Sequence, residues 1–335
     1  MTGAGTGSSA RVIHGPLAPA AAGQVLALAE VATAADGVAP LSEDALLQVR
    51  HGSRAGAVDL LLSVAAAAGA AHSGTDAADV VAGYAHLDAQ DEGAAEEDPD
   101  DGDFSGELIV HPGYRRQGFG TMLAAALISA TGDRGIRLWA HGDLPGAAGL
   151  ARSAGFIRVR SLWQMRIDLA EAELPEPAFP PGVSVRTFQP GKDEESWLAV
   201  NHAAFAHHPE QGSWTMTDLG LREAEPWFDP GGFFLAERDG RLAGFHWTKV
   251  HQPDRDGAAH DGGAPIGEVY VVGVDPQQQG GGLGRALTLV GLNYLRELGL
   301  AQVMLYVDES NGAAVRMYKA LGFRRWATDV MYRHA

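Results

Sequence analysis

A glycine-rich pattern occurs twice along this chain, and this repetition constrains the fold more than any other feature. Two sets of residues recur with a constant separation of 164 positions: Pro112, Gly118 and Gly120, and then Pro276, Gly282 and Gly284. A Gly-Phe pair, Gly155-Phe156, recurs as Gly322-Phe323 after 167 positions. Because several widely spaced positions agree, the chain is predicted to be an internal duplication, and its 335 residues predict two domains.

Each copy predicts a β-strand, a tight turn and a helix. In the second copy, Glu268–Val274 is rich in β-branched and aromatic residues, as buried strands are. Pro276 has no backbone N–H and ends the strand, and the chain becomes helical from Arg285. The glycines between them present backbone N–H groups at the start of a helix, an arrangement that suits a pyrophosphate group.

Other elements are predicted from apolar periodicity and turn residues. Helices are expected over residues 18–35, after Ser42 as N-cap, and over 197–205 and 313–321. Strands are expected over residues 59–66, 80–87, 183–188, 233–237, 242–250 and 303–307. Residues 1–10 are predicted to be disordered, and residues 88–106, 205–215 and 253–265 to be loops.

Two blocks of the second copy resemble the GCN5-related N-acetyltransferase (GNAT) family. The first is V-x-P-x-x-Q-x-x-G-x-G at residues 274–284, and the second is N-x-x-A-x-x-x-Y-x-x-x-G-F at residues 311–323. In that family the first block binds the pyrophosphate of acetyl-CoA, and the second lies along the pantetheine arm. The resemblance implies an α/β (α+β) fold of two tandem GNAT domains, each a mixed, splayed central sheet flanked by helices.

The expected domains are an N-terminal GNAT domain over residues 11–170 and a C-terminal, catalytic one over residues 183–335. Residues 171–182 are rich in proline and acid and are predicted to be the linker. The resemblance implies that both copies contact the coenzyme. In the first copy these residues are Leu108, Ile109, Val110, Arg116, Gln117, Gly118, Phe119, Gly120 and Thr121. In the second they are Val272, Gly273, Val274, Gln279, Gly280, Gly281, Gly282, Leu283, Gly284, Arg285, Asn311, Gly312, Ala313, Ala314, Val315 and Arg316.

The two copies differ in the groups that move protons. Acyl transfer to an amine needs a group that takes the amine proton, a donor for the thioester oxygen, and an acid for the departing thiolate. The resemblance implies Glu268, the backbone N–H of Val274, and Tyr318 for these roles. Counting back by 164 residues, Phe104 in the first copy corresponds to Glu268. Counting back by 166 residues, Arg152 corresponds to Tyr318 and Pro145 to Asn311. We therefore expect the first half to bind coenzyme without catalysing the reaction.

The second loop departs from the family pattern. Family members usually carry an arginine near Gly280 or Gly281, and the first copy keeps Arg115 and Arg116 at its loop. Without that arginine, the phosphate depends on backbone amides, with Arg285 and Arg316 as substitutes. Coenzyme binding is expected to persist more weakly.

Segments outside these blocks resemble one tandem-repeat branch of the family. They are Asp36–Pro40, Trp139–Gly142, Asn201–Ala206, His208–Thr215, Trp227–Pro230 and Gly244–His251. That branch acetylates the cysteinyl amine of a cysteine–glucosamine–inositol conjugate. The resemblance implies substrate contacts at Glu43, Glu210, Lys249, Glu268 and Tyr306. Carboxylate, ammonium and phenol groups all pair with sugar hydroxyls, which fits such a substrate.

Composition excludes several other classes of function. A formal net charge of −17 disfavours nucleic-acid binding, which needs a basic surface. The chain has no cysteine, so disulfides and a cysteine-bound acyl intermediate are excluded, and direct attack on the thioester is expected. No signal peptide or membrane-spanning segment is predicted, so we expect a cytoplasmic location. A monomer is also expected. His202, His207 and His208 match no metal-ligand motif, and no metal is expected.

Two alternatives stay open at this point. A protein of the same fold could acetylate another small-molecule or peptide amine. The altered second loop and the incomplete first copy also allow a sensor that binds acetyl-CoA without catalysis.

Overall fold

The computed structural model describes residues 11–64, 80–88, 103–206, 209–252 and 264–335. These residues divide into two units. The first contains residues 11–160 together with Asp329–Ala335, and the second contains residues 161–328. The last residues of the chain thus belong to the first unit.

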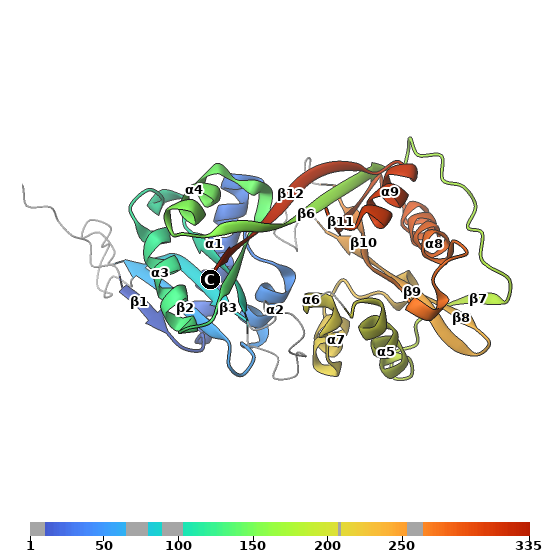
Figure 1. The fold of residues 1–335 in the computed structure, drawn as a ribbon, viewed down its shortest axis with the longest axis horizontal. Helices are drawn as coiled ribbons and strands as arrows, with labels where there is room; N and C mark the ends of the chain where they lie inside the picture. The colour runs from blue at the N-terminus through green and yellow to red at the C-terminus, as the bar shows by residue number, and fades with distance from the viewer. Residues whose placement is uncertain (1–10, 65–79, 89–102, 207–208, 253–263) are drawn as a thin grey trace, which may run out of the picture. The chain divides into compact units, whose positions relative to one another are not determined.

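The first unit is a mixed sheet with helices on both faces (Figure 1). Its strands lie in the order β1-β2-β3-β4-β5-β12, and only β4 and β5 are parallel among the pairs described. The strands are β1 Arg11–His14, β2 Val58–Val64, β3 Val80–Leu87, β4 Phe104–Val110, β5 Ile136–Ala140 and β12 Arg324–His334. The helices are α1 Pro19–Asp36, α2 Glu43–His51, α3 Phe119–Thr131 and α4 Pro145–Ser153.

Alternation along the strands divides the apolar residues of the first unit between two layers. Tyr84 and Ile109 pack against α1 and α2 on one face, in a cluster that includes Val25 and Leu28. Leu60 and Leu62, which point to the other face, pack against α3 and α4 in a second cluster. Successive strand side chains point to opposite faces, so both faces of the sheet are buried.

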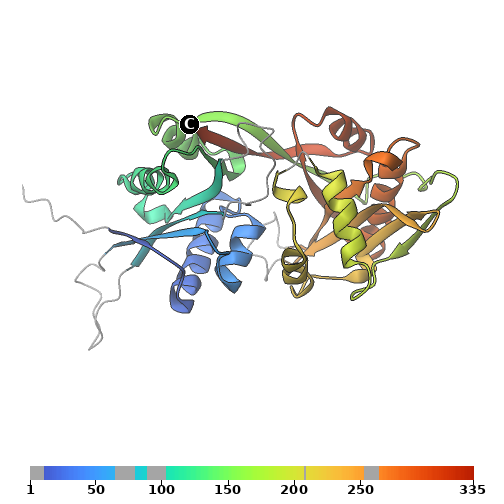
Figure 2. The same ribbon diagram turned by 60° about the horizontal axis from the view of Figure 1, so that its bottom comes forward.

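The second unit repeats this plan with strand order β6-β11-β10-β9-β8-β7 (Figure 2). Strands β10 and β11 are parallel, and the other described pairs are antiparallel. The strands are β6 Ile157–Asp168, β7 Val183–Thr187, β8 Phe233–Arg238, β9 Arg241–His251, β10 Ile266–Val274 and β11 Gln302–Asp308. The helices are α5 Glu194–Ala204, α6 Pro209–Gly212, α7 Met216–Glu223, α8 Leu283–Glu297 and α9 Gly312–Ala320.

The two faces of the second sheet have different cores. On one face α8 and α9 supply aliphatic residues such as Leu289, Leu292 and Val315. On the other face the core is aromatic, and Trp197 of α5 contacts Phe233, Phe245 and Trp247 with ring centroids 5.2–5.8 Å apart. Aromatic pairs at such distances stabilise a core beyond their buried area.

The predicted duplication is present in the backbone. Pro112 and Pro276 each open a short 3₁₀ turn, Pro112–Tyr114 and Pro276–Gln278. Gly118 (φ 86°, ψ −5°) and Gly282 (φ 86°, ψ 10°) are then the N-caps of α3 and α8. Positive φ values are accessible to glycine at little cost, which explains why both copies have glycine at this position.

Strands β10 and β11 separate before either strand ends. Their parallel pairing runs from Gly267–Val303 to Val269–Leu305, although β10 continues to Val274. Strands β4 and β5 separate in the same way after Glu107–Trp139. The end of β10, including Val274, therefore lies beyond the parallel ladder and directly before the glycine turn.

Some predicted boundaries are wrong. Strand β4 begins at Phe104, within the predicted loop, because Phe104 is buried and pairs with Ile136. Helix α8 begins at Leu283 instead of Arg285. Residues 205–215 are not all loop, because α6 forms and reciprocal hydrogen bonds between Asn201 and Gln211 hold it to α5. Residues 1–10, 89–102 and 253–263 lie outside the described residues.

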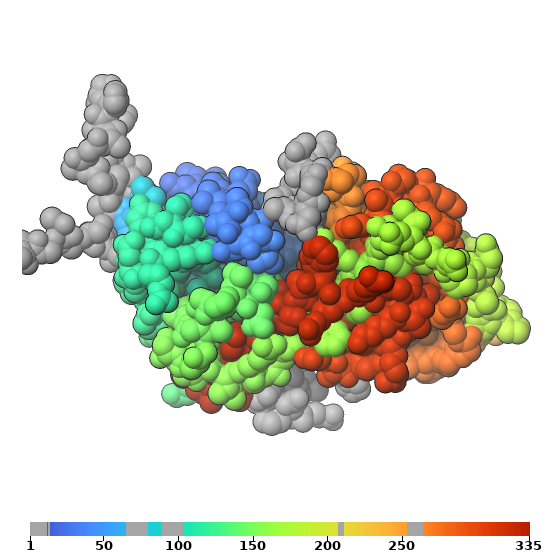
Figure 3. Space-filling model, turned by 90° about the horizontal axis from the view of Figure 1, so that it is seen from above, coloured from blue at the N-terminus to red at the C-terminus, as the bar shows by residue number. Residues whose placement is uncertain are grey.

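The proline-rich segment over residues 171–182 contains no helix or strand. It nevertheless contacts the second unit, where Leu174 packs on the aliphatic core and Phe179 on a smaller cluster around Leu283. Its yellow-green atoms lie along the surface in Figure 3. Apolar contacts therefore hold this extended segment against one unit.

We predict that Gly291→Ala destabilises the second unit. A Cβ at Gly291 would lie 2.1 Å from Cε1 of the buried His246 ring, so α8 would have to move away from β9. Overpacking of this kind costs roughly 1–3 kcal/mol, which urea unfolding measures. Gly220→Ala is the matched control, because a Cβ there meets nothing within 4 Å and the helix should become slightly more stable. A Gly291→Ala protein as stable as wild type would contradict the described packing.

Candidate functional site

The glycine turn of the second unit leaves its backbone accessible. Gly280, Gly281 and Gly282 have φ values of 92°, 61° and 86°, and a Cβ at Gly280 or Gly282 would meet nothing within 4 Å. The first turn of α8 follows at once, so its unpaired N–H groups point toward the same place. Arg285 lies in the first turn of α8, and Arg285 and Arg316 are both exposed. Backbone donors and positive helix ends bind phosphate groups, so the turn fits a pyrophosphate.

The first-unit turn keeps its backbone but loses one predicted side-chain donor. Arg115 is not available to a phosphate, because its guanidinium pairs with both oxygens of Asp36 at 2.6 and 2.7 Å. Arg116, whose φ is 63°, and Gly118 remain at the turn. The prediction that both arginines serve the phosphate is therefore wrong for Arg115, and its bidentate pair instead fixes α1 beside the turn.

The two predicted proton-transfer residues both belong to the second unit. Glu268 is buried on β10, and His251 Nε2 lies 2.6 Å from its Oε2. Tyr318 is buried on α9, where its ring meets Phe323 edge to face, and burial raises the pKa of its hydroxyl. Val269 points to the α8 and α9 side, so its neighbour Glu268 points to the opposite face. The two groups thus lie on opposite faces of the sheet of the second unit.

A β-bulge determines which residue of the first copy corresponds to Glu268. Val269 pairs with Thr248 and Val271 pairs with Trp247, so Tyr270 is the inserted residue. Strand β4 has no such bulge, so residues before the bulge correspond at an offset of 163 instead of 164, and Glu268 corresponds to Ser105. The constant offset that gave Phe104 is therefore wrong by one residue. The conclusion that the first copy has no carboxylate here is unchanged.

Lys249 and Tyr306 lie on strands next to Glu268. Lys249 is opposite Glu268 in the β9–β10 register, and its Nζ lies 4.4 Å from the Trp227 ring centroid and 5.3 Å from that of Tyr270. Tyr306 on β11 is 41% exposed, and its hydroxyl accepts a hydrogen bond from Gln164 Nε2 at 2.8 Å. Aromatic faces attract a buried ammonium, so they restrict where the Lys249 charge lies.

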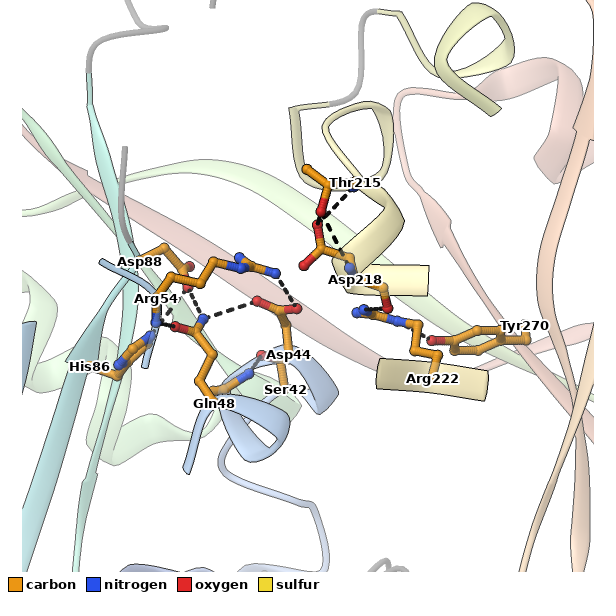
Figure 4. Close-up of polar contacts among 11 residues, drawn as sticks. Ser42, Asp44, Gln48, Arg54, His86, Asp88, Thr215, Asp218, Arg222 and Tyr270 are labelled. Atoms are coloured by element: carbon orange, nitrogen blue, oxygen red, sulfur yellow. Dashed lines mark hydrogen bonds and ion pairs between the residues drawn. The ribbon is translucent and has the colours of Figure 1, made fainter. Parts of the chain in front are cut away.

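Helix α7 was not predicted, although its sequence carries a start signal. Thr215 and Asp218 form a capping box, in which the Thr215 hydroxyl accepts from the Asp218 N–H and the Asp218 carboxylate accepts from the Thr215 N–H. Arg222 then stacks 3.8 Å over the Trp214 ring and donates through Nε to Tyr270 Oη at 2.9 Å (Figure 4). The Thr-x-x-Asp spacing signals this helix start, whereas the Arg222–Tyr270 bond depends on the bulge.

Glu43 and Glu210 are the remaining predicted substrate contacts. Glu43 is the first residue of α2, in the first unit, and Ser42 caps that helix by accepting from the Ala45 N–H. The Ser42 N–H in turn donates to Glu107 Oε2 at 2.8 Å. Glu210 lies in α6, but its side chain is outside the described residues. The first unit therefore holds the start of α2 through a buried carboxylate of β4.

That carboxylate belongs to a buried ion-pair cluster which the sequence did not predict. His141 lies between Glu107 Oε1, at 3.3 Å, and Asp329 Oδ2, at 3.1 Å. Burial favours the neutral ring, but the hydrogen bonds to Asp329 and Glu107 outweigh burial and raise the pKa of His141 to about 10. The ring is therefore charged at neutral pH. It links Glu107 of β4 to Asp329 of β12.

A second buried histidine lies on the α1 and α2 face of the same unit. His86 contacts Asp59 at 2.9 Å and Asp88 at 3.3 Å, and these bonds outweigh burial and raise the pKa of His86 to about 9. Asp88 also accepts from Gln48 of α2, as Figure 4 shows. The face that is aromatic in the second unit thus combines an aliphatic core with buried ion pairs in the first.

Among the residues that the structure describes, no three or more His, Asp or Glu side chains are arranged so that they could hold a metal ion. His202 has its Nε2 at 2.7 Å from the carbonyl oxygen of Trp214. His207 and His208 lie outside the described residues. Within the described part of the chain, no helix combines the length and the apolar character needed to cross a bilayer.

Comparison with known proteins identifies relatives along the whole chain. A model of the acetyltransferase (GNAT) family matches residues 62–156 and 197–323. A protein of Thermobispora bispora named mycothiol acetyltransferase is 58% identical over 92% of this chain and 94% of its own length. Proteins of the same name from Thermomonospora curvata and Streptosporangium roseum are 57% and 51% identical, over 92% and 97% of this chain and 92% and 99% of their own lengths.

Solved structures resemble the fold of the whole chain. A tandem GNAT protein from the clavulanic acid biosynthesis pathway has a TM-score of 0.67 at 22% identity and covers 97% of this chain and 98% of its own. A GCN5-related N-acetyltransferase from Sphaerobacter thermophilus has a TM-score of 0.63 at 25% identity, over 96% of this chain and 95% of its own. The predicted tandem GNAT fold and the predicted family are confirmed.

We predict that His141→Gln lowers the free energy of unfolding most at low pH. The folded-state pKa lies above the unfolded value of 6.5, so the stabilising protonation is complete below pH 6.5 and is lost as the pH rises through about 10. The difference between wild type and variant should therefore shrink by on the order of 2 kcal/mol over that range, as urea unfolding at several pH values would show. A difference that stays constant with pH would contradict a charged His141.

Proposed function

Because this chain belongs to the acetyltransferase (GNAT) family, we propose that it is a mycothiol-forming N-acetyltransferase. It transfers the acetyl group of acetyl-CoA to the cysteinyl amine of 1D-myo-inositol 2-(L-cysteinylamino)-2-deoxy-alpha-D-glucopyranoside, giving mycothiol and CoA. The observation that carries this proposal is the 58% identity, over 92% of the chain, to a protein named mycothiol acetyltransferase. That similarity extends through both units, beyond the coenzyme motifs that all members of the family share.

Acetyl-CoA binds at the glycine turn of the second unit in this proposal. The N–H groups of Gly280–Gly284 and of the first turn of α8 hold the pyrophosphate, with Arg285 and Arg316 adding charge. The separated end of β10 pairs with the pantetheine arm, because its Val272–Val274 backbone lies beyond the parallel ladder. The coenzyme supplies the thioester, and the chain orients it.

The reaction is a direct attack of the amine on the thioester carbon. Glu268 takes a proton from the amine as the C–N bond forms, and the Val274 N–H stabilises the negative charge on the thioester oxygen. The C–S bond then breaks, and Tyr318 gives its hydroxyl proton to the departing sulfur. Burial raises the pKa of Tyr318, so its hydroxyl is protonated at neutral pH and available to donate. Proton exchange with water restores both groups.

In this proposal the substrate is held by acidic side chains that accept hydrogen bonds and by a lysine and a tyrosine that donate them. Glu43 and Glu210 accept hydrogen bonds from sugar and inositol hydroxyls, and Lys249 and Tyr306 donate to oxygen atoms. The aromatic rings of Trp227 and Tyr270 restrict the position of the Lys249 ammonium, and this favours one orientation of the substrate. Carboxylates near the amine also favour a substrate that arrives with a positive charge.

The two halves have separate tasks in this proposal. The second unit catalyses the reaction, and the first unit binds coenzyme without turnover. Helices α4 and α9 match end to end at an offset of 167 residues, so Ala151, and not Arg152 as predicted, stands where Tyr318 does, and Ser105 stands where Glu268 does. A monomeric state and a cytoplasmic location remain predictions.

We predict that Glu268→Gln and Tyr318→Phe lower kcat with the cysteinyl conjugate. Removing the base should cost about 10²- to 10³-fold, and removing the acid about 10-fold or more, while KM for acetyl-CoA changes little. Chromatographic quantification of the released CoA measures kcat and KM, because the substrate itself carries a cysteine thiol. Glu297→Gln at the exposed end of α8 is the matched control and should be as active as wild type. Unchanged turnover in both site variants would refute the assigned roles, and turnover confined to other amines would refute the substrate.

We predict different effects for aspartate at the two matched glycines. Gly118→Asp and Gly282→Asp each place a carboxylate where a phosphate would bind, at a φ of 86° that also disfavours any side chain. Equilibrium dialysis with acetyl-CoA should show one fewer bound coenzyme per chain in each variant, whereas only Gly282→Asp should abolish turnover. Full coenzyme stoichiometry in Gly118→Asp would exclude the first turn as a binding site.

A further inference from the structure

Three buried polar side chains share one region of the second unit. Lys249, His251 and Glu268 are 7%, 9% and 7% exposed, and they come from the adjacent strands β9 and β10. Lys249 and His251 are two residues apart on β9, so their side chains lie on the same face, and Glu268 pairs with Lys249 across the two strands. Burying such groups is costly unless they are hydrogen-bonded, so their contacts carry information about their role.

His251 contacts the carboxylate of Glu268 directly. The distance from His251 Nε2 to Glu268 Oε2 is 2.6 Å, which is short for a nitrogen–oxygen hydrogen bond and typical of one to a charged acceptor. This hydrogen bond involves only Oε2 of the Glu268 carboxylate and not its other oxygen, Oε1. The ring nitrogen that faces a carboxylate must carry the proton, so the contact also fixes the tautomer of His251.

Holding β9 to β10 does not explain this bond. The two strands already pair along eight residue positions, from Ile266–His251 to Val274–Gly244. A side-chain bond at one end of such a ladder adds little to strand pairing. It does fix the side-chain rotation of Glu268, which has several rotatable bonds and would otherwise sample several directions.

We propose that His251 is the positioning residue of the acetyl transfer, which holds Glu268 Oε2 so that Oε1 is oriented to take the proton of the attacking amine. This inference rests on the proposed function and adds a residue to it. During the step the amine proton moves to Glu268 Oε1, the C–N bond forms, the C–S bond breaks, and the thiolate takes the Tyr318 proton. His251 keeps its proton throughout and changes no bond, because it acts through the orientation of the carboxylate.

Two substitutions separate positioning from packing. His251→Gln keeps a terminal N–H donor at a similar reach, and His251→Leu fills similar space without one. We expect kcat of His251→Gln to stay within about threefold of wild type and that of His251→Leu to fall by about 10- to 100-fold, while KM for acetyl-CoA stays within about twofold in both. Thermal unfolding verifies that both variants fold.

Thr248→Val is the matched control on the same strand. The Thr248 hydroxyl donates to the Gly232 carbonyl oxygen at 2.8 Å, beside Tyr294 of α8 and on the face opposite Lys249 and His251. Its loss removes one buried hydrogen bond from β9 without touching Glu268. This variant should be less stable than wild type and should keep its kcat, whereas a fall in kcat equal to that of His251→Leu would assign the effect to strand stability.

A double-mutant cycle with Glu268→Gln decides the mechanism. If His251 acts through Glu268, then adding His251→Leu to Glu268→Gln should change the single-turnover rate by less than about twofold. Losses that multiply, or a His251→Leu protein with wild-type kcat, would overturn the positioning role while leaving the proposed function intact. A fully active Glu268→Gln protein would overturn the catalytic assignment of Glu268 and this inference with it.

Discussion

The feature on which the site depends is the early end of parallel pairing between β10 and β11. Backbone N–H and C=O groups beyond Val269–Leu305 lose their neighbouring strand, and buried backbone groups need partners. An extended molecule with amide groups, such as a pantetheine arm, satisfies them in the same way as a strand. Because Gly282 then turns the chain directly into α8, the separated strand end and a helix N-terminus lie side by side. One interruption in a sheet thus creates both an amide-binding edge and a phosphate-binding end.

The two copies keep this backbone and differ in what buries the other face of the sheet. In the second unit the face opposite α8 and α9 is filled by Trp197, Trp214 and Trp247, and its polar groups gather where Lys249, His251 and Glu268 lie. In the first unit the corresponding layer contains His86 and His141, each between two carboxylates. Charged groups that are paired in this way support structure. Proton-transfer chemistry needs groups that change partners, which a closed ion-pair cluster does not provide.

The strand, turn and helix of each copy were predictable because proline and glycine act locally on the backbone. The acetyltransferase family was also predictable, because the two sequence blocks that indicate it are each short and continuous in the chain. What was missed depends on distant contacts. His141 contacts Asp329, which is 188 positions away, and no local pattern marks that pair. The bulge at Tyr270 shifts the register by one residue, so counting offsets gave Phe104 instead of Ser105. The bond from His251 to Glu268 follows from that same register and was equally invisible in the sequence.

The last strand has a consequence for biosynthesis. Residues Val330–His334 of β12 pair with β5, so the sheet of the first unit receives a strand that is synthesised after the whole of the second unit. While the ribosome is still adding the second unit, β5 has an open edge, and unpaired edges invite contacts with other chains. The amino-terminal half therefore completes its folding only after translation has passed through the second unit. An early stop that removes only these terminal residues would damage the half of the protein that was made first.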